Sequence, residues 1–151
     1  MVVRFEVLRN LPSRDKRLVL SAIWLLWNVR FSSWLSPARA LETYHRLPVE
    51  RSSSHRAPVY QLLWAIEAAV RFVPKTTSLT QALAAKTLLA RYGYDSKLHV
   101  GVAKEEETFQ AHAWLSQGGA ILLGEVEDLS KFRPLSSVKG QKTQLVWRSL
   151  Q

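Results

Sequence analysis

Two polar residues have types and positions that could support hydrolytic chemistry: Ser78 and His112, which lie 34 residues apart. Ser78 begins a segment that we predict to be helical, and the dipole and free N–H groups of a helix N-terminus stabilise negative charge. His112 lies in a segment of alternating apolar and polar residues, and imidazole exchanges protons near neutral pH. A hydroxyl and a base that meet in a fold are the elements of a nucleophilic site.

Each of these residues also has a structural explanation. Ser78 and Gln81 match the Ser-x-x-Gln capping box, which satisfies two free helix N–H groups without catalysis. A lone histidine in an alternating strand, such as His112, is more often a hydrogen-bonded core residue than a catalyst. We interpret the remaining three histidines as structural or solvent-facing: His45, His55 and His99.

Helical spacing predicts the elements that would position Ser78. We expect Ser78 to open a helix that Gly93 ends, since glycine commonly follows a helix C-terminus. Proline and serine signals predict three earlier helices, at residues 13–29, 37–45 and about 58–73. Residues 48–58 lack periodicity and predict a loop that could cover a cleft.

After Gly93 the period of the sequence changes to alternation, which predicts the elements that would carry His112. Three antiparallel strands are expected at residues 98–102, 109–115 and 120–123. A polar turn and a Gly-Gly turn separate them. We therefore expect an α+β fold in which N-terminal helices precede one further helix and a three-stranded antiparallel sheet.

We expect a single domain over residues 1–151, since 151 residues suit one compact unit. Its parts are a mainly helical N-terminal region, a core and a polar tail without an assigned role, at residues 1–74, 75–135 and 136–151 respectively. A short alternating piece occupies residues 1–12. We expect three tryptophans to be core aromatics: Trp24, Trp27 and Trp64.

Composition narrows the classes of function. The net charge of +9 favours an acidic partner such as nucleic acid, anionic lipid or an acidic peptide. The basic residues are scattered rather than gathered in blocks, which disfavours nucleic acid. The longest apolar stretch, residues 18–27, has about half the length of a bilayer span, so we expect no membrane crossing. The chain has no cysteine, so thiol catalysis and thiolate metal sites are absent from it.

Three stretches together carry a resemblance to a known family. They are Ser78-Leu79-Thr80-Gln81-Ala82-Leu83, then the strand that holds Gly101-Val102, then His112-Ala113-Trp114. Over about residues 58–135 the chain resembles the leader peptidases of lasso-peptide biosynthesis. Those enzymes belong to the transglutaminase-like cysteine peptidases and show Cys-Leu-x-x-Ala-Leu followed by His-Ala-Trp.

The resemblance implies a function and a set of site residues. It implies a transglutaminase-like or papain-like core that cuts a precursor peptide between its leader and its core. Ser78 would occupy the nucleophile position and His112 would be the general base. Trp114 would line the cleft beside His112 and bind substrate, or pack against the helix. No metal or organic cofactor is implied.

Two departures from the family's pattern concern activity. The family's cysteine is replaced by Ser78, whose hydroxyl is far less acidic than a thiol, so we expect weak or absent activity. Either a laboratory Cys-to-Ser substitution or a natural serine variant fits, and the intact His112 favours the substitution. The family's orienting acid is also missing from residues 121–124, and Glu125 is the candidate for that role.

The resemblance implies partners as well. They are the precursor peptide, bound through its leader, a small leader-binding recognition protein and a macrolactam-forming synthetase. The basic helices at residues 13–46 are the expected docking surface for the leader-binding protein. We expect a cytoplasmic protein. Two rival functions remain open: a non-catalytic peptide-binding scaffold of the same fold, and a basic nucleic-acid-binding domain.

Overall fold

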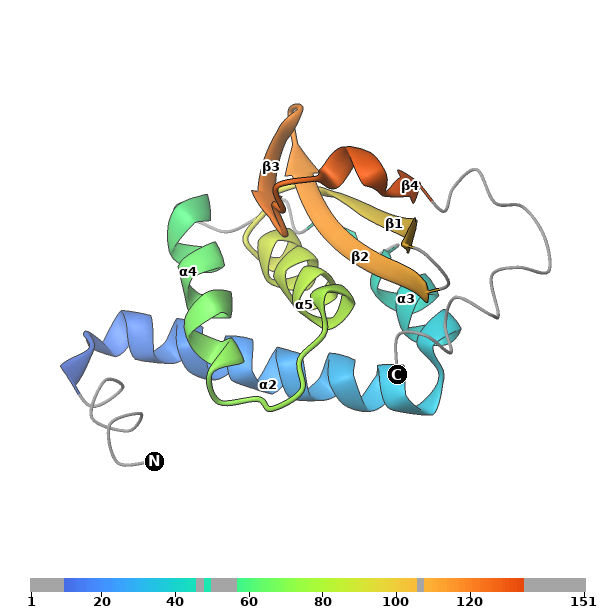
Figure 1. Ribbon diagram of the computed structural model, residues 1–151. Helices are drawn as coiled ribbons and strands as arrows, with labels where there is room; N and C mark the ends of the chain where they lie inside the picture. Colours follow the sequence, from blue (N-terminus) through green and yellow to red (C-terminus); the bar gives the residue numbers. More distant parts are fainter. Residues whose placement is uncertain (1–9, 46–47, 50–56, 106–107, 135–151) are drawn as a thin grey trace.

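The computed structural model describes residues 10–45, 48–49, 57–105 and 108–134. Most of the piece at residues 1–12, most of the loop at residues 48–58, and the tail at residues 136–151 lie outside this part. Helices come first and strands follow (Figure 1), in the chain order α2 (Ser13–Leu35), α3 (Pro37–His45), α4 (Val59–Val70), α5 (Ser78–Arg91), β1 (Lys97–Glu105), β2 (Thr108–Gln117), β3 (Ala120–Leu123), η1 (Leu129–Lys131) and β4 (Arg133–Pro134). The expected α+β class is confirmed.

Helix α5 is the centre of the fold. It lies between α2 on one side and the sheet on the other (Figure 1). Every residue from Leu79 to Ala90 except Gln81 is buried, because both sides of the helix are covered. The helix ends at Arg91, and Gly93 follows with φ of 81°, which confirms the predicted glycine stop.

The core of the described residues includes a buried lysine, Lys86. Lys86 of α5 donates to the Ser96 carbonyl oxygen at 2.6 Å, just before β1 begins. Burial lowers the pKa of Lys86, and the negative charge of Asp95 opposes part of that shift. The bond ties the second half of α5 to the start of the sheet.

Helix α2 is longer than the sequence predicts, since it continues six residues beyond residue 29. Six residues on its inner side are buried in the core: Leu18, Val19, Ala22, Leu25, Leu26 and Val29. By length and composition alone, α2 is apolar enough to cross a bilayer, but core helices and signal sequences satisfy the same criterion. The prediction for the three tryptophans is wrong: Trp24, Trp27 and Trp64 are 58%, 47% and 38% exposed.

Within the described residues the sheet has four strands in the order β3-β2-β1-β4, all antiparallel. The three predicted strands are present, and the short β4 was not predicted. Since β3 and β4 lie at opposite edges, the segment between them must cross the sheet. It crosses on the face away from α5, where the Cβ atom of Phe132 lies 2.8 Å from the position that a Cβ on Gly101 would occupy. A glycine at residue 101 of β1 therefore gives the crossing segment room.

Candidate active site

Ser78 is the first residue of α5, and the cap of this helix is the preceding residue. The Thr77 side-chain oxygen accepts a hydrogen bond from the Thr80 backbone N–H at 3.2 Å. The predicted capping box, with Ser78 as cap and Gln81 as its partner, is therefore wrong. A cap needs extended backbone and an oxygen near the free N–H groups, and Thr77 supplies both. The Ser78 hydroxyl is left available for another contact.

That contact is made with the sheet. The Ser78 Oγ atom accepts a hydrogen bond from the Ala113 backbone N–H at 3.2 Å. Ala113 is paired with Val100 of β1, whereas the pairing of β2 with β3 reaches only Leu115. Among the described strands, none pairs with Ala113 along the other edge of β2, so its N–H can reach the start of α5. The helix N-terminus and the strand that carries His112 therefore meet at an open edge of β2.

His112 lies at the same edge, and its ring is fixed by a backbone group. Its Nε2 atom is 2.7 Å from the Gly124 carbonyl oxygen. A carbonyl oxygen only accepts, so Nε2 carries the proton and donates it. In the neutral ring the unprotonated nitrogen is then Nδ1. A neutral acceptor holds the imidazole in one tautomer here.

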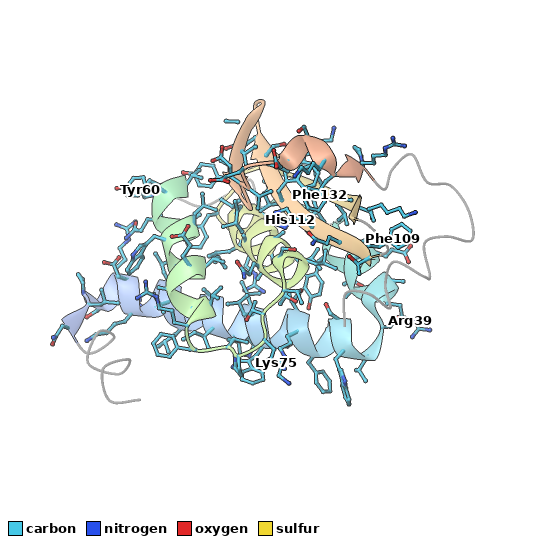
Figure 2. The ribbon with its side chains drawn as sticks, in the orientation of Figure 1. Arg39, Tyr60, Lys75, Phe109, His112 and Phe132 are labelled. Carbon is cyan, nitrogen blue, oxygen red and sulfur yellow. The ribbon has the colours of Figure 1, made fainter. Side chains whose placement is uncertain are left out.

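The ring of His112 lies on the face of the sheet away from the body of α5. Alternation along β2 buries Ala113 and Leu115 against the helix and turns His112 and Trp114 to the opposite face. There the centroid of the His112 ring lies 5.4 Å from that of Phe132 and 6.3 Å from that of Trp114. Figure 2 shows His112 and Phe132 close together above α5. The described contacts join Ser78 to the strand through the Ala113 N–H and show no direct bond to the imidazole.

Gly124 is the residue whose backbone makes this arrangement possible. It follows β3 directly and has φ of 84°, a conformation that glycine adopts at little cost. A Cβ at this position would lie 2.7 Å from the Ala113 carbonyl oxygen and 3.0 Å from the Trp114 Cα atom. The backbone of Gly124 therefore packs directly on β2, and this close approach brings its carbonyl oxygen to His112.

Trp114 lies beside the candidate base. Its ring stacks on His99 with centroids 5.3 Å apart and an interplanar angle of 10°, and it covers Gly101. The Nε2 atom of His99 is 2.7 Å from the Ser116 hydroxyl oxygen. Burial, and to a lesser degree Lys97, lower the pKa of His99. Trp114 thus lies on the sheet face away from α5, near His112 and stacked on His99.

Glu125 is the candidate acid from the sequence, and it directly follows Gly124 in the chain. Glu125 is exposed, and the structure describes no hydrogen bond or ion pair for its carboxylate. The described hydrogen bond of the His112 ring is made with the main chain, at the carbonyl oxygen of Gly124. Sequence reasoning missed Gly124 and Phe132 because it searched for an acidic side chain. The available signal was the glycine at the end of Ile121-Leu122-Leu123, which is typical of a strand that stops at a positive φ.

The arrangement suits acyl transfer. A helix N-terminus and the Ala113 N–H direct positive potential at the side chain of residue 78, and an imidazole lies at the same edge of the sheet. In the described part of the chain, no three His, Asp or Glu side chains gather as a metal site would require.

Comparison with known proteins bears on the family. A family model described as the transglutaminase-like superfamily matches residues 22–137, which is most of the chain. No curated protein matches the chain significantly. No solved structure does so either.

Proposed function

Because the chain belongs to the transglutaminase-like superfamily, which includes cysteine-type peptidases and acyltransferases, we propose that it is a leader peptidase of lasso-peptide biosynthesis. Its substrate would be a ribosomal precursor peptide, cut between leader and core. The observation that supports this proposal best is the contact of Ser78 with Ala113, the residue that follows His112. It brings the helix-end motif and the His-Ala-Trp strand together at one edge of the sheet.

The proposed chemistry begins with a cysteine at position 78. The thiolate sulfur would take the position of Ser78 Oγ. The helix N-terminus and the Ala113 N–H stabilise its negative charge, because both direct positive charge at that position. His112, with Nε2 occupied by Gly124, takes the thiol proton on Nδ1. Since His112 and residue 78 share an edge but no direct bond, the ring must turn or approach when substrate binds, as catalytic contacts often do.

The remaining steps follow from the same groups. The thiolate sulfur bonds to the scissile carbonyl carbon, and free N–H groups at the start of α5 stabilise the oxygen that gains negative charge. The imidazolium returns its proton to the leaving amine as the C–N bond breaks, which leaves a thioester. Water then attacks the thioester carbon, gives a proton to His112, and releases a carboxylate and the thiol.

In the present chain, serine weakens this chemistry. A thiol at a helix N-terminus ionises near neutral pH, whereas a hydroxyl starts too high in pKa for a useful alkoxide fraction. We therefore propose that the chain binds the precursor but cuts it slowly or not at all. The same property would suit a form that traps its substrate.

The proposed partners are the leader-binding recognition protein, which presents the precursor, and the macrolactam-forming synthetase, which uses the product. Of the segment at residues 13–46, the exposed polar side of α3 is the surface that we propose for the leader-binding protein. It carries Arg39, Glu42 and Thr43. A mixed polar surface of this kind is typical of interfaces between proteins that associate reversibly. Location in the cytoplasm is part of the proposal.

A second function has one observation in its favour. The Ser78 hydroxyl is already engaged as an acceptor from the Ala113 N–H, and its described contacts do not include His112. A protein that used this fold only to hold a peptide would need no closer approach. The alternative proposal is therefore a non-catalytic peptide-binding scaffold of the same fold.

The experiment that separates the two functions is a leader-cleavage assay followed by mass spectrometry. The precursor peptide and the leader-binding protein are mixed with the chain, with its Ser78→Cys form and with a Ser78→Cys/His112→Ala form. Peptidase function predicts cleavage by Ser78→Cys that disappears in the double variant. Gly119→Ala in the Ser78→Cys form is a matched control, since that exposed turn lies outside the site and offers open space.

Two results would remove the peptidase proposal. One is an inactive Ser78→Cys form that still binds the precursor with the affinity of the parent chain, which would favour the scaffold. The other is cleavage that persists without His112, because then the histidine would not be the base. Circular dichroism of each variant shows whether a loss reflects unfolding.

A further inference from the structure

The outward side of α2 carries a continuous apolar surface that the described residues leave uncovered. We call it the aromatic stripe, and it consists of Leu20, Trp24, Trp27, Phe31, Trp34 and Leu35. Every member is at least 47% exposed, and Trp34 is 72% exposed. Up to Trp34 the spacings are four, three, four and three residues, so the side chains lie along one face of the helix for about 20 Å.

The aromatic stripe is a second apolar face, distinct from the one that holds the fold together. The core residues of α2, Leu18 and Leu25 among them, are almost fully buried and lie on the opposite side of the helix by helical spacing. The sheet and α5 lie on the core side of α2, and the segment that joins α4 to α5 passes across the middle of α2 (Figure 1). The stripe therefore lies along the side of α2 away from the core, and the cations described for it are Arg30 and Arg91.

Cationic side chains lie next to the aromatic stripe. The guanidinium of Arg30 lies over the Trp27 ring at 5.6 Å, and that of Arg91 lies over the Trp24 ring at 5.9 Å. Figure 2 shows Lys75 beside the middle of α2, next to the Pro74 carbonyl oxygen to which Arg30 donates. These contacts place positive charge on the aromatic faces themselves, where an anionic ligand would meet ring and cation together.

A cationic hollow adjoins the beginning of the aromatic stripe. It lies between the first turns of α2 and the end of α5, and it is lined by Arg14, Arg17, Leu18, Ser21 and Tyr92. Two guanidinium groups, a hydroxyl and a phenol are suitable donors for a phosphate group. Arg14 and Arg17 are both exposed, so the hollow is accessible from solvent.

We propose that the aromatic stripe is a membrane-binding surface, on which α2 lies in the plane of an anionic lipid bilayer. Trp and Phe on one face of a helix, with arginine and lysine beside them, are the residues that interfacial helices use. A flat bilayer can contact the members of a straight stripe, and its anionic headgroups match the net charge of +9. Phosphate headgroups would enter the hollow at Arg14 and Arg17.

The same observations disfavour two other modes. A second copy of the chain would bring two sets of stripe cations together, and like charges at an interface are unfavourable. A membrane-spanning α2 would have to leave the core, where Val19, Leu26 and Val29 are fully buried. Lipid contact through the outward side alone keeps both the core and the edge of β2 at Ser78 as they are.

The test uses the full chain and large unilamellar vesicles. Vesicles of phosphatidylcholine alone are compared with vesicles that also contain phosphatidylglycerol, and flotation gives the bound fraction. We expect binding to the anionic vesicles with a blue shift of tryptophan emission, and little binding to the neutral ones. Binding should weaken with salt, because the headgroup attraction is screened.

Paired variants connect the binding to the aromatic stripe. Phe31→Ser/Trp34→Ser should lower the partition coefficient at least tenfold. The control Tyr60→Ser/Phe109→Ser removes two rings that are 75% and 55% exposed on α4 and β2, away from the stripe, and should bind like the parent chain. All four residues are exposed, so each variant is expected to fold, and thermal unfolding checks this.

A second pair of variants addresses charge. Arg14→Gln/Arg17→Gln should lower binding to anionic vesicles by about fivefold for each charge removed. The control Lys97→Gln/Lys104→Gln removes two exposed cations from β1 and should have a smaller effect.

Three results would overturn the proposal. They are equal binding to neutral and anionic vesicles, unchanged binding of Phe31→Ser/Trp34→Ser, and absence of vesicle binding altogether. Sedimentation equilibrium then identifies the alternative occupant. Self-association that Phe31→Ser/Trp34→Ser abolishes would show that a second copy of the chain covers the aromatic stripe. A chain that stays monomeric and binds no vesicle would indicate that a partner protein covers it.

Discussion

Gly124→Ala is the substitution that tests the site geometry most directly. Gly124 has φ of 84°, and its backbone lies against β2 so closely that a Cβ would come 2.7 Å from the Ala113 carbonyl oxygen. The new methyl group must push the Gly124 segment away from the strand. His112 would then lose the carbonyl that now lies 2.7 Å from its Nε2 atom.

The expected loss of stability can be estimated by comparing Gly124 with Gly119, which has nearly the same backbone conformation. Gly119 has φ of 86° and open space where a Cβ would stand, so Gly119→Ala costs only the conformational term. That term is about 1 kcal/mol after the reduced entropy of the unfolded chain is counted. Steric overlap in a packed region adds about 1–3 kcal/mol. We therefore expect Gly124→Ala to lower the free energy of unfolding by about 2–4 kcal/mol.

Urea unfolding of the parent chain and of both variants measures this difference. The activity part is measured in the Ser78→Cys form, where Gly124→Ala should reduce kcat for leader cleavage and Gly119→Ala should not. Conditions are chosen so that both variants stay folded, which far-UV circular dichroism confirms.

Equal losses of stability in the two variants would refute the argument, because the close approach to β2 would then cost nothing. Full cleavage activity in a destabilised Gly124→Ala variant would refute the proposed link between the Gly124 carbonyl and activity. It would show that the proposed chemistry does not need the Gly124 carbonyl to orient the His112 ring.

Three further predictions concern single residues. Thr77→Ala should lower stability by about 1 kcal/mol in urea unfolding, since the Thr77 oxygen caps α5, whereas Gln81→Ala should change it little. His99→Gln should flatten the stability-pH curve: burial lowers the pKa of His99 below its usual 6.5, so its contribution is complete above that value and is lost as pH falls through the lowered pKa. Unfolding at several pH values would show no change in slope if His99 is not responsible. In the Ser78→Cys form, Glu125→Gln should leave the cleavage rate unchanged, and a large drop would restore Glu125 as the orienting acid.

Much of the fold follows from local signals in the sequence. The glycine stop at Gly93, the Pro37 start of α3 and the limits of β3 depend on residues within a few positions of each other, and the structure has them as predicted. The extension of α2 to Leu35 was not predicted: the helix continues through Asn28 and Arg30 without a break. The short β4 was missed because a strand of two residues is too short to show an alternating apolar and polar pattern.

The orientation of α2 shows why an apolar pattern does not determine burial. Leu25 and Trp24 are neighbours in an apolar run, yet one is 1% and the other 58% exposed. A helix with apolar residues on two opposite sides leaves open which side faces the core. The side with leucine, valine and alanine packs against α4 and α5, where small and aliphatic side chains allow close approach. The large rings remain outside.

The candidate site shows a different limit of sequence reasoning. Motif spacing selected Ser78 and His112, and the structure brings the Ser78 hydroxyl to the residue beside His112 because the pairing of β2 and β3 stops at Leu115. The group that orients His112 belongs to the main chain, and no side-chain motif specifies a carbonyl. What the sequence does specify is a residue at 124 that tolerates positive φ and has no Cβ. Position 124 therefore requires a glycine, whereas a search for a catalytic triad would look for an acidic residue there.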